Sequence, residues 1–188
     1  MTSVVLVEGH SDRIALETLA RRQGRDLGDV EVLAMGGITN ARAHVLRLAP
    51  TGVRLAGLYD AAEEGYVRRA LAAGGLAGPD ADPAASGFHR CVADLEDELI
   101  RALGTDAVEA VIESAGETRS LRLLAQMPAQ RGWDRVALVR RFLTSRSGRK
   151  ARYARLLVEA LDLGHVPAPL TAVLDAGMIQ PSTSVGRS

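Results

Sequence analysis

The sequence predicts an α/β fold, in which a parallel sheet flanked by helices is followed by a mainly helical second half. In the first half of the chain, short apolar runs rich in valine alternate with segments of helical periodicity, as in strands joined by helical crossovers. In the second half, leucine, isoleucine and valine recur at helical spacing. With 188 residues, of which 47% are apolar, the chain is long enough for one well-covered core. We therefore expect a single domain.

The expected elements alternate between strand and helix. The expected strands lie at residues 3–7, 30–35, 53–59 and 88–92. The expected helices of the first half, of which the first is capped by Ser11, lie at residues 11–24, 40–48 and 62–73. The Gly- and Pro-containing stretch 74–87 is expected to be a loop. The expected division is one domain at 1–176, made of an α/β core at 3–92 and a helical extension at 93–176, and a flexible tail at 177–188.

Composition narrows the possible functions. The 23 basic and 23 acidic residues give a formal net charge of zero, so any contact with nucleic acid must come from a local basic patch. Cys91 is the only cysteine, which excludes an intrachain disulfide and favours a reducing, cytoplasmic location. No apolar run approaches the roughly 20 residues that span a bilayer, so no membrane contact is expected. With two Phe, three Tyr and one Trp, the chain lacks the stacking platforms of single-strand-binding modules.

Acidic residues end two of the expected strands. The first strand leads into Glu8 and, four residues later, Asp12, while the third strand ends at Asp60. Sites of parallel sheets form at the carboxyl ends of strands, and Mg²⁺ takes oxygen ligands from one or two carboxylates. We therefore interpret Glu8, Asp12 and Asp60 as candidate metal ligands. The alternative is that Asp12 complements the helix dipole and Glu8 is a solvated strand end.

A third acidic group lies where the expected fourth strand gives way to a helix. Asp94, Glu96, Asp97 and Glu98 fall within five residues, and such clustering is repulsive unless cations or basic groups neutralise it. This pattern is compatible with a metal site. The alternative is an N-cap aspartate followed by a solvated acidic turn.

Basic residues gather around the start of a late helix. They are Arg140, Arg141, Arg146, Arg149, Lys150, Arg152 and Arg155. Because a helix N-terminus carrying Arg and Lys can receive a phosphate, Ser147, Arg149, Lys150 and Arg152 are candidate phosphate- or DNA-binding residues. Lys150 is the only lysine of the chain, which indicates a specifically placed charge. The alternative is a solvated basic face.

The order of these motifs resembles a known family. A strand followed by Glu8-Gly9-His10-Ser11-Asp12, then Gly36-Gly37, then a strand ending in Tyr59-Asp60 resembles the Toprim domain of topoisomerases, primases and overcoming-lysogenization-defect (OLD) nucleases. The segments 94–99 and 147–150 resemble the OLD branch in particular. The resemblance extends over residues 3–160 and implies a Toprim-like parallel sheet.

The resemblance also implies a function, which is metal-dependent phosphodiester cleavage by a DNA nuclease or nickase. It implies Mg²⁺ or Mn²⁺ as the cofactor, with two ions, and Glu8 and Lys150 as the catalytic residues. The implied metal ligands are Glu8, Asp12, Asp60, Asp94 and Glu96, and Lys150 would stabilise charge on the phosphate. DNA is the implied partner.

The chain departs from this family at two points. Where the family has Asp-x-Asp after the third strand, this chain reads Asp60-Ala61-Ala62, and Glu63 is one residue late. The third acidic group fills the gap, or one metal binds weakly, or the domain has lost catalysis. No ATPase domain accompanies the motifs, so we expect a stand-alone unit with an ATPase partner in trans. The alternative function is a catalytically weakened module that binds nucleic acid or that ATPase without turnover.

Overall fold

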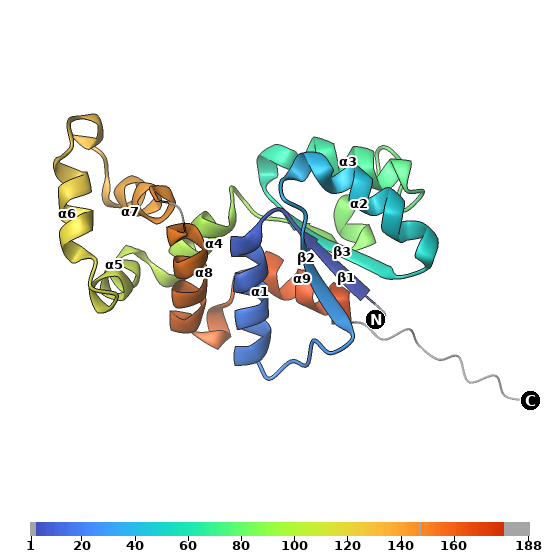
Figure 1. The fold of residues 1–188 in the computed structure, drawn as a ribbon, viewed down its shortest axis with the longest axis horizontal. Helices are drawn as coiled ribbons and strands as arrows, with labels where there is room; N and C mark the ends of the chain where they lie inside the picture. Colours follow the sequence, from blue (N-terminus) through green and yellow to red (C-terminus); the bar gives the residue numbers. More distant parts are fainter. Residues whose placement is uncertain (1–2, 147, 179–188) are drawn as a thin grey trace, which may run out of the picture.

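The computed structural model describes residues 3–146 and 148–178, and its centre is a four-stranded parallel sheet (Figure 1). The strand order is β2-β1-β3-β4. The strands are β1 (Ser3–Val7), β2 (Val30–Ala34), β3 (Arg54–Tyr59) and β4 (Phe88–Arg90). All three neighbouring pairs are parallel, so the predicted α/β class with a helix-flanked parallel sheet is confirmed.

Helices make up most of the remaining described chain. They are α1 (His10–Arg22), α2 (Ala41–Leu48), α3 (Glu64–Ala73), α4 (Leu95–Leu103), α5 (Thr105–Ser114), α6 (Thr118–Gln126), α7 (Arg135–Thr144), α8 (Arg149–Ala160) and α9 (Ala168–Met178). The mainly helical second half is thereby confirmed. The predicted cap at Ser11 is wrong, because Gly9 occupies the N-cap position and Ser11 is buried in the first turn.

The two faces of the sheet are covered by different helices. Along β1, Val4 and Leu6 contribute to one apolar cluster, which they share with α2 and α3. Val5 and Val7 point the other way, into a larger cluster that includes α1, α9 and the helical extension. Because both faces are covered, all five residues of β1 are buried, as a valine-rich run without polar alternation predicts.

The last helix returns to the sheet. α9 contacts β1, β3 and β4, so it belongs structurally with the α/β core although it follows the helical extension in sequence (Figure 1). Gly177 is buried, and a Cβ atom there would lie 2.6 Å from Cγ2 of Val5. The helix therefore includes residues 177 and 178, which the sequence had assigned to the tail. The rest of that expected tail, 179–188, lies outside the described residues.

The helical extension is joined to the core through α1 and α8, which pack side by side (Figure 1). Arg22 of α1 donates from Nη1 to the carbonyl oxygens of Val158 and Leu161 at the end of α8, each at 2.7 Å. Beyond α8, the helices α5, α6 and α7 stand away from the sheet. No helix within 3–146 or 148–178 is both long enough and apolar enough to cross a membrane.

Candidate metal centre

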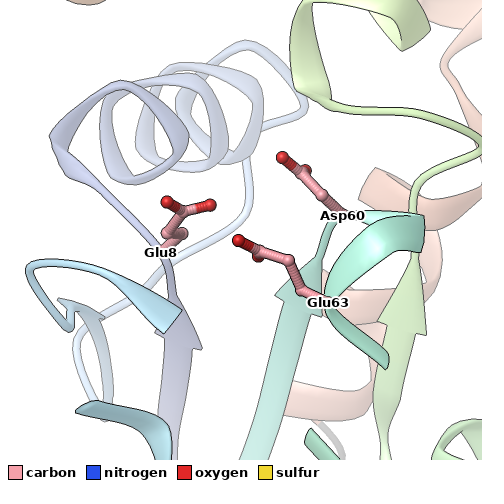
Figure 2. Close-up of side chains that lie close together, drawn as sticks. All are labelled: Glu8, Asp60 and Glu63. Carbon is pink, nitrogen blue, oxygen red and sulfur yellow. The ribbon is translucent and has the colours of Figure 1, made fainter. Parts of the chain in front are cut away.

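The centre forms at the carboxyl edge of the sheet. β1 pairs in parallel with β3, with Leu6 opposite Gly57, so the chain leaves both strands at the same edge. Glu8 follows β1 and Asp60 follows β3. Figure 2 shows that these two carboxylates and that of Glu63 point toward one another, and one oxygen of each lies within 4.8 Å of the others. Glu8 and Asp60 thus lie close together, as their positions at the ends of two parallel strands predict.

Glu63 is the residue that sequence reasoning missed. Residues Ala61–Glu63 form a single 3₁₀ turn, in which the amide of Glu63 donates to the carbonyl oxygen of Asp60 at 2.9 Å. Because a 3₁₀ helix has three residues per turn, position 63 returns above position 60. The side chain of Glu63 therefore reaches the place that an aspartate two residues after Asp60 would be expected to serve. Ala62 is exposed.

Among the described residues, no basic side chain forms an ion pair with any of the three carboxylates. Burial, followed by the charges of Asp12, Asp94 and Glu63, raises the pKa of Asp60 to about 7. Burial, followed by the charge of Glu8, raises the pKa of Glu63 to about 7. Oε2 of Glu63 is buried and has no hydrogen-bond partner among the described residues. A divalent cation would satisfy that oxygen and relieve the repulsion, so these residues fit a hard metal ion.

Asp12 lies beside this cluster and also shapes it. Its side chain is buried in the first turn of α1, and Oδ2 accepts a hydrogen bond of 2.8 Å from the amide of Gly9. Burial raises the pKa of Asp12, against the opposing effects of the Gly9 amide and of Lys150. Asp12 therefore fixes the turn that presents Glu8 and adds negative charge to the centre.

Lys150 reaches the centre from α8. Its Nζ atom lies 3.3 Å from Oε2 of Glu96, whose side chain is only 5% exposed. Burial opposes the charge on Lys150, but the carboxylates of Glu96 and Asp12 outweigh it and raise the lysine pKa. Burial likewise raises the pKa of Glu96, which Lys150 partly offsets. The extension thus contributes the cation of Lys150 to this acidic edge of the sheet.

Asp94 is held by two partners within the protein. Oδ1 accepts from the amide of Asp97 at 2.8 Å, which caps α4, and Oδ2 pairs with Arg140 of α7. The N-cap prediction for this aspartate is therefore confirmed, but the predicted solvated acidic turn is wrong, because Glu96 and Glu98 are buried. Asp94 and Glu96 lie outside the three-carboxylate cluster, although Asp94 is close enough for its charge to raise the pKa of Asp60. Arg140 was not among the predicted site residues.

The expected phosphate-binding residues are dispersed. Arg149 is buried, with Nη2 2.6 Å from Oε2 of Glu117 and its guanidinium 3.9 Å from the ring centroid of Phe142. These contacts occupy its guanidinium inside the extension. Arg152 is half-exposed and pairs with Glu117 at 2.5 Å. Ser147 lies outside the described residues.

Comparisons with known proteins agree with this fold. Residues 2–61 match the family model for the TOPRIM domain of overcoming-lysogenization-defect-like proteins. A search of curated proteins found no match. The C-terminal region of the Burkholderia pseudomallei OLD protein superposes with a TM-score of 0.65 and 20% identity, over 93% of this chain and 95% of that one.

A second solved structure, the C-terminal region of the Xanthomonas campestris pv. campestris OLD protein, gives a TM-score of 0.69 at 24% identity, over 94% of this chain and 91% of that one. Identities this low establish the fold alone. The chain therefore resembles the TOPRIM domain of OLD-like proteins in sequence over residues 2–61, and the C-terminal regions of two OLD proteins in fold.

Proposed function

We propose that this chain cleaves phosphodiester bonds in DNA, as a metal-dependent nuclease or nickase of the Toprim type. The observation that supports the proposal most strongly is the convergence of Glu8, Asp60 and Glu63 at the carboxyl edge of a parallel sheet. Glu63 supplies the carboxylate that Ala62 does not, so the departure from Asp-x-Asp leaves the acidic character of the site intact.

Each residue has a proposed role. Glu8, Asp60 and Glu63 would hold Mg²⁺ or Mn²⁺, which when bound polarises a phosphoryl oxygen and activates a water molecule. Lys150 would stabilise negative charge that develops on the phosphate, with Glu96 holding its ammonium in place at 3.3 Å. Glu8 and Lys150 are thus the proposed catalytic pair.

A second ion would have to displace existing partners of its proposed ligands. The remaining proposed ligands are Asp12, Asp94 and Glu96, and each has a partner inside the protein: the Gly9 amide, Arg140 and Lys150 respectively. We propose that the first ion binds at Glu8, Asp60 and Glu63, and that a second ion binds more weakly because it must compete with Arg140 and Lys150.

A second candidate function is a module that binds DNA, or an ATPase in trans, without turnover. The neutralisation of Asp94 by Arg140 and of Glu96 by Lys150 favours it, because two-metal cleavage needs both positions to be available. The two candidates differ in whether divalent ions produce cleavage.

Cleavage of supercoiled plasmid in Mg²⁺ and in Mn²⁺ separates them. We expect nicking by the wild type, none by Glu8→Ala or Glu63→Ala, and a rate about 100-fold lower in Lys150→Ala. Glu113→Ala, which removes an exposed acid on α5, is the matched control and should cleave like the wild type. Cleavage that survives in Glu8→Ala contradicts the proposal. No nicking by a folded wild type in either ion favours the binding module.

A further inference from the structure

A groove runs between α2 and α3, the two helices that cover the Val4 and Leu6 face of the sheet. It has a volume of about 500 Å³, and these two helices pack against each other. Its polar side chains are Thr39 in the 3₁₀ turn before α2, Arg42 in the first turn of α2, and Tyr66 and Arg69 of α3. The other lining residues, Ile38, Ala72 and Ala73, are apolar. Among the described residues, the lining includes two arginines and no acidic side chain. We call this feature the α2–α3 groove.

The two arginines are available to a ligand. Both are exposed, and neither forms an ion pair with any other described residue. The acid closest to Arg69 along α3 is Glu64, whose two oxygens are already taken by Arg68 at 2.6 Å and Arg90 at 2.9 Å. The positive charge of the groove is therefore not cancelled locally.

Tyr66 holds one of these charges in position. The guanidinium carbon of Arg69 lies 4.8 Å from the centroid of the Tyr66 ring, which is itself 44% exposed. A Cβ atom on Gly65 would lie 3.3 Å from Nη1 of Arg69, so the arginine folds back toward the start of α3. This contact preorganises the guanidinium in the groove.

Each wall of the groove is connected to a residue of the metal centre. Tyr66 lies three residues after Glu63 in the chain. On the other side, the turn that leads into Thr39 contains Gly37, whose amide donates to the carbonyl oxygen of Glu8 at 3.0 Å. Gly37 has a φ of 119°, which glycine adopts without strain. Both walls of the groove are therefore anchored to metal-centre residues.

We propose that the α2–α3 groove holds the sugar-phosphate backbone of DNA next to the phosphodiester at the metal centre, with Arg42 and Arg69 each contacting a phosphate. An acidic edge repels the DNA backbone, so a flanking pair of unpaired arginines supplies the local attraction that a net charge of zero does not. Identifying the bound strand as substrate rests on the proposed nuclease function, but DNA binding in the groove does not.

Fluorescence anisotropy with a fluorescein-labelled DNA duplex, in EDTA and over a series of salt concentrations, tests this inference. Arg42→Gln and Arg69→Gln should each weaken binding several-fold and lower the slope of log Kd against log salt by about one, as expected when one phosphate contact is lost. Arg119→Gln removes an exposed arginine on α6, far from the groove, and should bind like the wild type. Circular dichroism confirms that each variant is folded.

Wild-type-like binding by Arg42→Gln and Arg69→Gln would overturn the inference, as would an equal loss in Arg119→Gln or no binding by the wild type at low salt. Because EDTA removes the metal, this result is independent of cleavage. If Arg42→Gln and Arg69→Gln weaken DNA binding but the wild type shows no metal-dependent nicking, only the nuclease proposal is contradicted. If the wild type nicks DNA but Arg42→Gln and Arg69→Gln bind DNA as tightly as the wild type, only the inference about the groove is contradicted.

Discussion

Asp60 and Glu63 carry the most perturbed carboxyl groups of the metal centre. Their ordinary pKa values are 3.8 and 4.5, and both rise to about 7 through burial and through neighbouring carboxylates. At pH values between these ordinary pKa values and about 7, Asp60 and Glu63 of the folded chain retain protons that the unfolded chain has released. Stability must therefore fall as pH rises through this window, because the unfolded state binds fewer protons there. A cation bound to the ionised carboxylates would cancel the loss.

Thermal unfolding should show both effects. In EDTA, the melting temperature should fall between about pH 5 and about pH 8. Mn²⁺ should raise it more at the higher pH, where the carboxylates are ionised and can bind the ion. Glu63→Gln should flatten the pH dependence and lose the response to Mn²⁺. Differential scanning fluorimetry measures all of these, and an equal Mn²⁺ response at both pH values would contradict the account.

The sequence predicts that Arg149 binds phosphate, whereas its contacts in the structure predict that it stabilises the fold. Its side chain is 7% exposed and pairs with Glu117. Arg149→Met should lower the free energy of unfolding by about 3 kcal/mol, the lower end for a broken buried pair, because Arg152 continues to neutralise Glu117. Arg152→Met, the matched control at a half-exposed position, should cost at most about 1 kcal/mol. Equal losses in urea-unfolding curves would contradict this assignment.

At the scale of elements, the edge strand β4 packs closely against β3. Gly57 lies opposite Phe88, and a Cβ atom at position 57 would lie 2.4 Å from Cδ1 of that ring. The glycine is therefore required by packing, since the ring occupies the space of a side chain.

Gly57→Ala should consequently destabilise the fold by about 1–3 kcal/mol, the usual cost of overpacking a core. Gly78→Ala is the control, because no atom lies within 4 Å of a Cβ atom built there. Its free energy of unfolding should match the wild type. If denaturant unfolding finds Gly57→Ala as stable as Gly78→Ala, the close packing of β4 against β3 is not as described.

The strands and the metal-site edge were predictable from sequence because their signals are local. Continuous apolar runs mark β1 and β3. Because neighbouring parallel strands end at the same edge of the sheet, the residues that follow them, Glu8 and Asp60, are expected at that edge. The place of α9 against the sheet was not predictable, because its apolar pattern is the same as that of a helix in the extension. Glu63 was missed because its position depends on whether the turn after Asp60 is 3₁₀ or extended, and residue spacing alone does not decide this.

At the scale of the whole molecule, the centre is assembled from two distant parts of the chain. The α/β core supplies Glu8, Asp60 and Glu63, whereas the extension supplies Lys150 through α8, which packs on α1. The chain has equal numbers of acidic and basic residues, yet it separates them locally into an acidic edge and an arginine-lined groove. This separation is what the proposed metal-dependent nuclease would require.

Calorimetric titration with Mn²⁺ tests most directly whether Glu8, Asp60 and Glu63 hold a divalent cation. The wild type should bind the ion, Glu63→Gln should bind it at least about tenfold more weakly, and Glu113→Gln on α5 should match the wild type. Such a result would establish Glu63 as the ligand that stands in for the absent aspartate. Unchanged Mn²⁺ affinity in Glu63→Gln, or no binding by the wild type, would contradict the claim.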